Sequence, residues 1–284
     1  QTKFRDEIRP RFGMMRGREF LMKDAYSFHQ DLDSLNDTYQ DCRDAYRNIF
    51  QRCGLNFIEA AADSGSIGGD VSSEFLVIAD TGEDEVLVAP SIGYAANVEA
   101  AKCIDVITNH APYNEEIEIV ETPNIKTISD IATFFNVKTS ETLKSIFVVD
   151  SSGANILLCL RGDVELNEAK VKSMLGGSFK FASNQELQTV FGCLPGFIGP
   201  VSTKESVTIY CDYSLRENSH YIAGANSNDQ HIKNLVLDRD ISAFTWCDIR
   251  NASAGDPCPN DTSISLESQR GIEVGHIFKL GKKY

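Results

Sequence analysis

The chain has 284 residues, of which 42% are hydrophobic and 24% are charged, and its formal net charge is -14. This composition is typical of a soluble globular protein and leaves room for two ordinary domains. No apolar run approaches the roughly 18–20 residues of a membrane span, and no signal peptide is visible, so we expect a cytoplasmic protein without a membrane partner. The acidity argues against indiscriminate nucleic-acid binding.

The first 29 residues differ in charge from the rest. Residues 1–23 hold seven basic and three acidic side chains, a net charge of +4, which leaves -18 for the remainder. Residues 2–8 and 19–28 alternate as two strands do, and the loop 9–17 is rich in Pro, Gly and Arg. The pattern predicts a β-hairpin with arginines on both arms, suited to a small polyphosphate.

A long amphipathic helix follows, from Leu32 to Cys53, and Gly54 ends it. Strands are expected at 55–61, 73–80 and 85–89, with a Gly-rich loop at 63–70. Up to residue 89 the pattern therefore predicts an antiparallel sheet with one long helix.

Beyond Pro90 helices and strands alternate. Helices are expected over 128–135, over 168–176 with Asn167 as N-cap, and over 184–192. Strands are expected at 145–150, 155–163, 179–183 and 206–215, and a last strand at 271–284 follows the turn-rich segment 251–263. The fold class is therefore α/β (α+β), with a separate domain in the second part.

The eight cysteines, at positions 42, 53, 103, 159, 193, 211, 247 and 258, are spaced too widely for a CxxC pair. This spacing argues against a zinc ribbon or a thioredoxin-type site, so no metal site is expected. Free, mostly buried thiols are the prediction.

The hairpin carries the first candidate site. Arg5 and Glu7 are two residues apart on one strand and share a face. An arginine can hold a phosphate or carboxylate bidentately, and a glutamate can accept a hydrogen bond from an adenine amino group. Arg16 would reach outer phosphates, and Phe20 would stack on a base. A solvated, salt-bridged hairpin is the alternative that charge alone leaves open.

Several sequence blocks together resemble one family. The hairpin resembles motif 2 of class II aminoacyl-tRNA synthetases, and "QTKFRDEIRPRFGMMRGREFLMKDAYSFH" is similar to the bacterial-type prolyl-tRNA synthetases. The blocks "ADSGSIGGDVSSEF", "GYAANVEAAK", "LRGDVELNEAK", "DIRNASAGDPCP" and "RGIEVGHIFKLGKKY" look like further parts of that family in the same order.

The resemblance implies an enzyme that activates proline with ATP and Mg²⁺ and transfers it to tRNA(Pro). It implies that Arg5 binds the α-phosphate and the proline carboxylate, that Glu7 contacts adenine, and that Arg16 binds the outer phosphates. Phe20 would stack on the adenine. Such chemistry depends on positioning and charge neutralisation more than on a proton-transferring residue.

By the same resemblance, His29, Glu74 and His276 would line the proline pocket. The family usually has a His where this chain has Ser73, and a small residue in place of Asp70. Both departures bear on the shape and polarity of the expected pocket.

The resemblance also implies a YbaK-like editing domain at 90–268, which hydrolyses alanine wrongly attached to tRNA(Pro). Its expected residues are Lys144, on a short helix before a strand, and His231, which would screen the alanine methyl group. Gly196, Gly199 and Pro200 would bring backbone groups to the ester, with water as the nucleophile. His220 replaces a usual aspartate, and Phe197 makes the loop bulkier.

Residues 1–89 would then be the motif 2 part of the catalytic domain, and 269–284 its return strand. Motifs 1 and 3 and the anticodon-binding domain have no counterpart here, so we expect a fragment truncated at both ends, from a protein that is a homodimer at full length. A free-standing aminoacyl-tRNA deacylase and a non-catalytic tRNA-binding paralogue are the alternatives.

Overall fold

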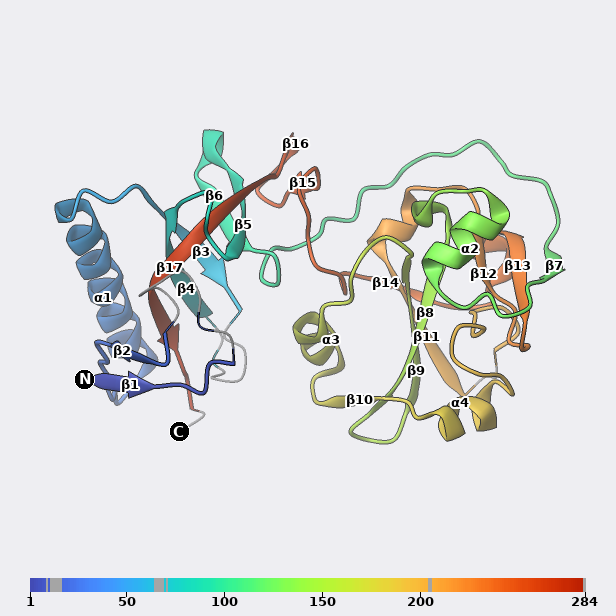
Figure 1. The fold of residues 1–284 in the computed structure, drawn as a ribbon, viewed down its shortest axis with the longest axis horizontal. Coiled ribbons are helices and arrows are strands. Elements are labelled where there is room, and N and C mark those ends of the chain that lie inside the picture. The colour runs from blue at the N-terminus through green and yellow to red at the C-terminus, as the bar shows by residue number, and fades with distance from the viewer. Residues whose placement is uncertain (9, 11–16, 64–68, 70, 204–205, 283–284) are drawn as a thin grey trace. The chain divides into compact units, whose positions relative to one another are not determined.

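The computed structural model describes the chain except for residues 9, 11–16, 64–68, 70, 204–205 and 283–284 (Figure 1). The chain divides into two compact units, Gln1–Gly54 and Leu55–Tyr284. Within the described residues, every helix is too short or too polar to span a membrane. The helices are α1 (Leu32–Arg52), α2 (Ile128–Phe135), α3 (Glu168–Leu175), α4 (Asn184–Val190) and α5 (Leu237–Asp240), with 3-10 turns η1 (Pro90–Ile92), η2 (Thr139–Glu141) and η3 (Tyr213–Arg216).

The first unit contains the predicted hairpin and the predicted helix. Strands β1 (Thr2–Phe4) and β2 (Glu19–Leu21) pair antiparallel and are shorter than the alternation suggested. Helix α1 begins where the Asp31 side chain accepts a hydrogen bond from Ser34 N at 2.8 Å. It ends just before Gly54, whose φ of +68° is a conformation that glycine adopts without strain. Both helix boundaries confirm the sequence signals.

A closed five-stranded barrel forms part of the second unit, in the order β17-β4-β3-β6-β5. Its strands are β3 (Phe57–Ala62), β4 (Val71–Ile78), β5 (Asp84–Ala89), β6 (Tyr94–Asn97) and β17 (Glu267–Lys279). The sequence predicted an antiparallel sheet here, but β3 and β6 pair in parallel and β17 pairs with both β4 and β5, which closes the barrel. Strand β6 also extends the barrel past residue 90, where we placed the start of the second domain. That boundary stays a prediction.

A mixed five-stranded sheet, β10-β8-β9-β11-β14, organises the other part of this unit. Its strands are β8 (Leu143–Asp150), β9 (Asn155–Arg161), β10 (Phe179–Phe181), β11 (Val207–Asp212) and β14 (Thr245–Cys247). Strands β9, β11 and β14 run parallel, and β8 is antiparallel to both its neighbours. The mixture of helices with this sheet confirms the α/β (α+β) fold class.

Each face of the mixed sheet has its own apolar core. One core contains Phe147, Phe197 and Leu235, and it includes residues of the three-stranded sheet β12 (Tyr221–Gly224), β13 (Gln230–Leu235) and β7 (Glu118–Glu121). The other contains Val148 and Val171, the latter from α3. Successive residues of a strand point to opposite faces, which is why neighbouring residues of β8 belong to different cores. A small hairpin, β15 (Pro257–Cys258) with β16 (Asp261–Ser265), completes the unit.

Candidate functional site

The hairpin of the first unit brings two of the predicted ATP-binding residues together. The Arg5 guanidinium carbon lies 5.2 Å from the centre of the Phe20 ring, a cation–π distance. Backbone bonding fixes this geometry, because Arg5 N donates to Arg18 O at 3.0 Å. Arg18, which the sequence analysis did not single out, donates from Nε to the Glu7 carbonyl oxygen at 2.9 Å. The predicted partner Arg16 lies outside the described residues.

His29 lies in the same unit, and both of its ring nitrogens have partners. Nδ1 is 2.9 Å from the Ser34 hydroxyl and Nε2 is 2.7 Å from the Ser27 hydroxyl. Its predicted place in a proline pocket therefore remains a prediction.

Glu74 and His276, two other predicted pocket residues, face each other across β4 and β17. His276 Nδ1 lies 3.7 Å from Glu74 Oε1 and 3.5 Å from Glu273 Oε1. Burial raises the pKa of Glu74 to about 7, and the Glu273 carboxylate adds to the rise while His276 opposes it. The neighbouring Ser73 is buried, and Asp70 lies outside the described residues.

Lys144 is not on a short helix, as we predicted, but is the second residue of strand β8. The preceding turn η2 ends at Glu141, and the strand begins two residues later, at Leu143. The Lys144 ammonium donates to Val164 O at 2.6 Å and lies 3.7 Å from the Glu165 carboxylate. The lysine thus points to the face of β8 that carries Val148, away from the face that carries Phe147.

Two asparagines hold the predicted glycine-rich loop, 192–201, and Asn228 accepts a hydrogen bond from Leu194 N at 2.8 Å. The Asn226 amide nitrogen donates to Gly199 O and Val201 O at 3.0 and 2.8 Å, and its oxygen accepts from Gly199 N at 2.8 Å. A Cβ atom on Gly199 would lie 1.9 Å from the Gly224 carbonyl oxygen, so only glycine fits. The Gly199 N–H is therefore already paired within the protein, and Pro200 beside it is buried and has no N–H.

His231 lies on β13 and is fully buried. Its Nδ1 is 2.6 Å from the hydroxyl of Thr122, a residue that the sequence analysis missed. Its Nε2 is buried without a hydrogen bond of ordinary geometry among the described residues. Burial lowers the pKa of His231, while the Gly196 backbone acts in the opposite direction, so the imidazole is neutral near pH 7.

Phe197 connects the loop to His231. Its ring lies edge-on to the imidazole at 5.6 Å and is itself almost fully buried. Gly196, next to it, has a φ of +97°, a conformation that glycine tolerates. The structure therefore brings Gly196, Phe197, Thr122 and His231 together, while Lys144 contacts a different core.

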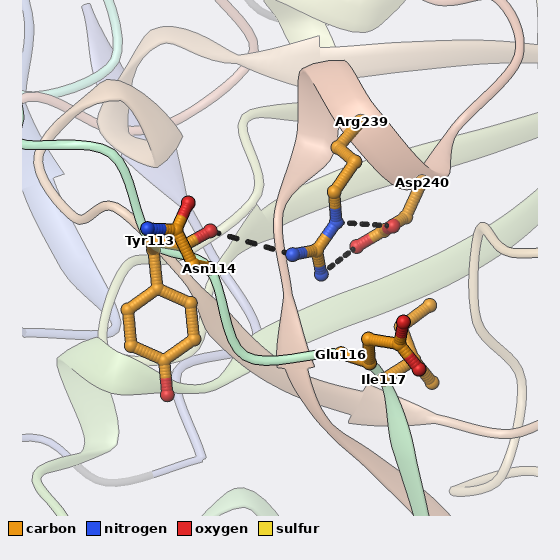
Figure 2. Close-up of a pocket in the computed structure, with 6 residues that line it drawn as sticks. All are labelled: Tyr113, Asn114, Glu116, Ile117, Arg239 and Asp240. Carbon is orange, nitrogen blue, oxygen red and sulfur yellow. Dashed lines mark hydrogen bonds and ion pairs between the residues drawn. The ribbon is translucent and has the colours of Figure 1, made fainter.

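His220 lies just before β12 and stacks on Tyr113, with ring centres 3.8 Å apart. The Tyr113 hydroxyl donates to the Asn234 side chain at 2.9 Å. Tyr113 also lines an open pocket of about 510 Å³ with Asn114, Glu116, Ile117, Arg239 and Asp240 (Figure 2). None of these six residues was predicted to act in catalysis. The Arg239 guanidinium fastens the segment 113–115, because it donates to the backbone carbonyl of Glu115 at 2.8 Å.

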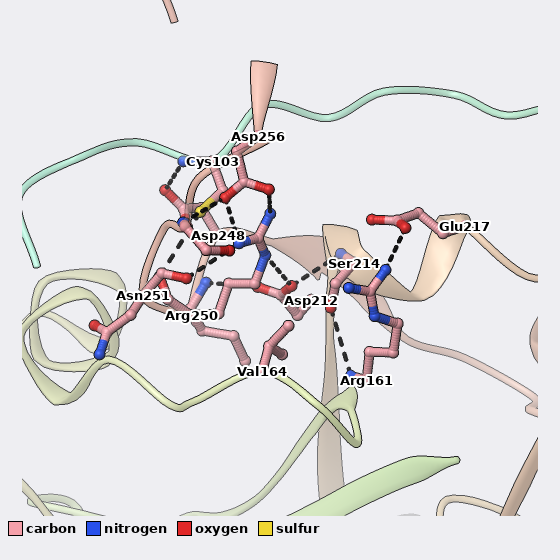
Figure 3. A network of polar contacts seen from close by, with 12 residues as sticks. Cys103, Arg161, Val164, Asp212, Ser214, Glu217, Asp248, Arg250, Asn251 and Asp256 are labelled. Carbon is pink, nitrogen blue, oxygen red and sulfur yellow. Dashed lines mark hydrogen bonds and ion pairs between the residues drawn. The ribbon is translucent and has the colours of Figure 1, made fainter. Parts of the chain in front are cut away.

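A buried polar network joins the end of β11 to the segment that follows β14 (Figure 3). Arg250 forms two hydrogen bonds with the Asp256 carboxylate, at 2.7 and 2.8 Å, and its Nε lies 3.4 Å from Asp212. Asp212 is fully buried, and burial raises its pKa although hydrogen bonds from Ile249 N and Ser214 oppose the rise. The sequence analysis missed Asp212, because its partner lies 38 residues further along the chain.

Lys170 on α3 extends this network. Its ammonium donates to Ala101 O at 2.7 Å, to Asp248 at 2.8 Å and to Arg250 O at 2.9 Å. One side chain thus joins α3 to two segments that are far apart in the sequence. All eight cysteines are free, as predicted, and six are buried, although Cys53 is exposed and Cys42 is partly so.

Residues 122–240 match the family model of the aminoacyl-tRNA editing domain, a range that begins at Thr122 and includes His231. The chain thus contains an aminoacyl-tRNA editing domain. It is 46% identical over 285 residues to the proline–tRNA ligase of Pelobacter propionicus, and 42% identical over 285 residues to that of Bacillus licheniformis. Each match covers 100% of this chain and 50% of the relative. Over its whole length the chain is therefore similar to half of a bacterial proline–tRNA ligase, as the sequence blocks indicated.

The chain spans half the length of these curated relatives. A solved structure described as "a putative trans-editing enzyme for prolyl tRNA synthetase" aligns with 48% of this chain and 87% of its own, at 19% identity and a TM-score of 0.43. This likeness is too distant to place any site residue.

Proposed function

We propose that the editing domain hydrolyses the ester of Ala-tRNA(Pro), and that the first unit supplies ATP-binding residues for the activation of proline. The observation that supports editing best is the buried, neutral His231, held by Thr122 and facing the loop at Gly196. An imidazole fixed in this way would screen the alanine methyl group, the role that the family resemblance implies for His231.

Editing compensates for a physical limit on how well the synthetic site can discriminate between amino acids. A pocket that accepts proline excludes the smaller alanine only by the contacts that alanine lacks, about 1–3 kcal/mol per missing methylene. A second pocket that admits alanine and rejects proline increases the overall discrimination between the two amino acids. Phe197, which packs against His231, adds bulk to the wall of that pocket and would help to exclude the proline ring.

Hydrolysis needs a water that attacks the ester carbonyl and a group that stabilises the oxyanion. The Gly199 N–H is already bonded to Asn226, so the oxyanion would be bound by other groups of the loop or by the tRNA's own hydroxyl. The Lys144 ammonium, on the other face of β8, would act on a phosphate of the tRNA end rather than on the ester.

For synthesis, Arg5 would neutralise charge on the ATP α-phosphate and the proline carboxylate, Glu7 would contact the adenine, and Arg16 would hold the outer phosphates. Mg²⁺ would arrive with the ATP phosphates, and we assign no protein ligand to it. The Arg5 guanidinium covers part of the Phe20 ring face. An adenine would therefore stack beside the guanidinium or displace it. Proline, tRNA(Pro) and homodimerisation belong to this proposal as properties of the full-length enzyme.

The test of editing is deacylation of Ala-tRNA(Pro) and of Pro-tRNA(Pro) by the chain, by His231→Ala and by Lys144→Ala. We expect the wild type to hydrolyse the alanyl ester, the His231 variant to lose discrimination against the prolyl ester, and the Lys144 variant to lose rate on both. Lys180→Ala is the control, because Lys180 is an exposed residue of β10 that pairs with Glu186.

Absence of alanyl ester hydrolysis by the wild-type chain would contradict the editing function. Unchanged discrimination in the His231 variant would contradict the pocket. The first result would favour a non-catalytic tRNA-binding role, whereas the second would leave hydrolysis in place and assign the discrimination to other residues. Proline-dependent ATP–pyrophosphate exchange measures the synthetic half separately, and we expect it from the full-length enzyme and not from this chain.

A further inference from the structure

Strand β17 contains a bulge that places two acidic side chains around one histidine. Glu273 lies opposite Leu76 and Gly275 lies opposite Phe75, so Val274 is an extra residue without a partner on β4. Residues three apart in a regular strand point to opposite faces. The bulge reverses this, so Glu273 shares a face with His276, and Glu74 lies directly opposite His276 on the neighbouring strand.

The three side chains converge on a common point. His276 Nδ1 lies 3.5 Å from Glu273 Oε1 and 3.7 Å from Glu74 Oε1, and all three donor atoms lie within 4.8 Å of one another. Zinc binds nitrogen and carboxylate oxygen at about 2.0–2.2 Å, so two of its tetrahedral ligands are about 3.4 Å apart. The two distances from His276 Nδ1 are therefore close to those of a tetrahedral set.

The imidazole is poorly satisfied by its protein neighbours. Both carboxylates are further from Nδ1 than the 2.7–3.2 Å of an ordinary hydrogen bond. Nε2 is buried and has no partner among the described residues. An ion bound at Nδ1 would not supply a partner for Nε2, so Nδ1 and the two carboxylates alone argue for the ion. Stacking on Phe278, with ring centres 3.9 Å apart, fixes the plane of the ring.

The charges favour a cation at this point. Two carboxylates face one imidazole, and the side chains of Glu74 and His276 are each only 15% exposed while that of Glu273 is 47% exposed. A cation between the two carboxylates would offset their repulsion. An oxygen-only set would suit Mg²⁺ or Ca²⁺, whereas an imidazole with carboxylates suits zinc and its neighbours in the transition series.

We propose that Glu74, Glu273 and His276 bind one divalent ion of the zinc class, with a fourth position open to water. The site goes beyond the proposed function and does not depend on it, because ion binding is measured on the chain without tRNA or ATP. Glu273 distinguishes this site from the predicted proline pocket, which included His29, Glu74 and His276 but not Glu273.

The test is a titration of the intact chain with Co²⁺, followed by its visible absorption, and displacement of the Co²⁺ by Zn²⁺. The test variant is Glu273→Gln, because this side chain is half exposed and its loss should leave the fold intact. The matched control is Glu267→Gln on the same strand, whose side chain is exposed. A Cys42→Ser/Cys53→Ser variant removes the two thiols that are not buried, and circular dichroism verifies folding.

We expect saturation at one Co²⁺ per chain, a spectrum without thiolate charge-transfer bands, and unchanged binding in both control variants. Loss of a ligand should weaken binding in Glu273→Gln by at least the 10–100-fold that loss of a supporting residue costs at other metal sites. Lack of saturable binding, thiolate bands, or equal affinity of folded Glu273→Gln and wild type would each overturn the proposal.

Discussion

The Thr122 hydroxyl and the His231 Nδ1 atom share a buried hydrogen bond of 2.6 Å, although the residues are 109 positions apart. This bond fixes the plane of the imidazole and joins the start of the editing domain to β13. The orientation of His231 therefore depends on a residue that precedes α2 in the chain.

Thr122→Val should leave Nδ1 of His231 without a partner while keeping the shape of the side chain. An unsatisfied buried group costs about 1–3 kcal/mol, so we expect a loss of that size in the free energy of unfolding, measured by denaturant titration. Thr122→Ser keeps the hydroxyl and should lose less. Equal losses in the two variants would show that the methyl group, rather than the hydrogen bond, matters.

The stability of the protein should fall as the pH drops below about 6.5. Burial lowers the pKa of His231, so the unfolded chain takes up a proton more readily than the folded chain does. The resulting contribution to stability is complete above the unfolded pKa and decreases as the pH falls below it. The slope of the free energy of unfolding between pH 7 and 5 should be smaller in His231→Gln, and identical slopes would contradict a buried neutral imidazole.

Gly199→Ala should be strongly destabilising, because its Cβ would lie 1.9 Å from the Gly224 carbonyl oxygen. Both atoms belong to the backbone or are fixed to it, so relief requires the loop to move, at a cost of about 1–3 kcal/mol or more. Gly192→Ala in the same loop is the control. Its φ is +79° and its Cβ would meet nothing within 4 Å, so it should cost only about 1 kcal/mol. Similar thermal shifts in the two variants would contradict the steric explanation.

Lys170→Met should destabilise the second unit by about 3–5 kcal/mol, because it leaves the partly buried Asp248 carboxylate without its partner. Lys172→Met on the same helix is the matched control. Lys172 makes an exposed contact of 3.7 Å with Glu168, and such pairs contribute about 0.3–0.5 kcal/mol. Chemical denaturation of both variants measures the difference. A loss below 1 kcal/mol in Lys170→Met would show that its three hydrogen bonds are replaced by water.

The elements with local signals could be predicted from the sequence. Helix α1 has a capping Asp31 and a terminating Gly54, and α3 has the predicted cap Asn167, which accepts a hydrogen bond from Lys170 N. Between these ends, the periodic spacing of apolar residues was sufficient to predict the helices. Strands β12 and β13 were missed because each is short and is flanked by polar turn residues, so tertiary packing rather than local pattern decides their structure.

The site residues likewise divide into those that could be predicted from the sequence and those that could not. The resemblance to a family indicated His231 and the glycine loop, but not the contacts around them. Thr122 and Asp212 were missed because their partners come from distant parts of the chain. Glu273 was missed because residues three apart in a regular strand point to opposite faces. No residue type around Val274 indicates the bulge that reverses this. Lys144 was placed on a helix because a single 3-10 turn resembles the start of one.

The pairing of β17 with β4 and β5 has a consequence for synthesis of the chain. Gly271 pairs with Ile78, a separation of 193 residues (271 minus 78). The ribosome therefore makes the whole editing domain before the strand that closes the barrel exists. During that interval the edges of β4 and β5 are unpaired and open to other strands. Rapid folding of the editing domain, with its own sheets and cores, would shorten the period in which these edges can aggregate.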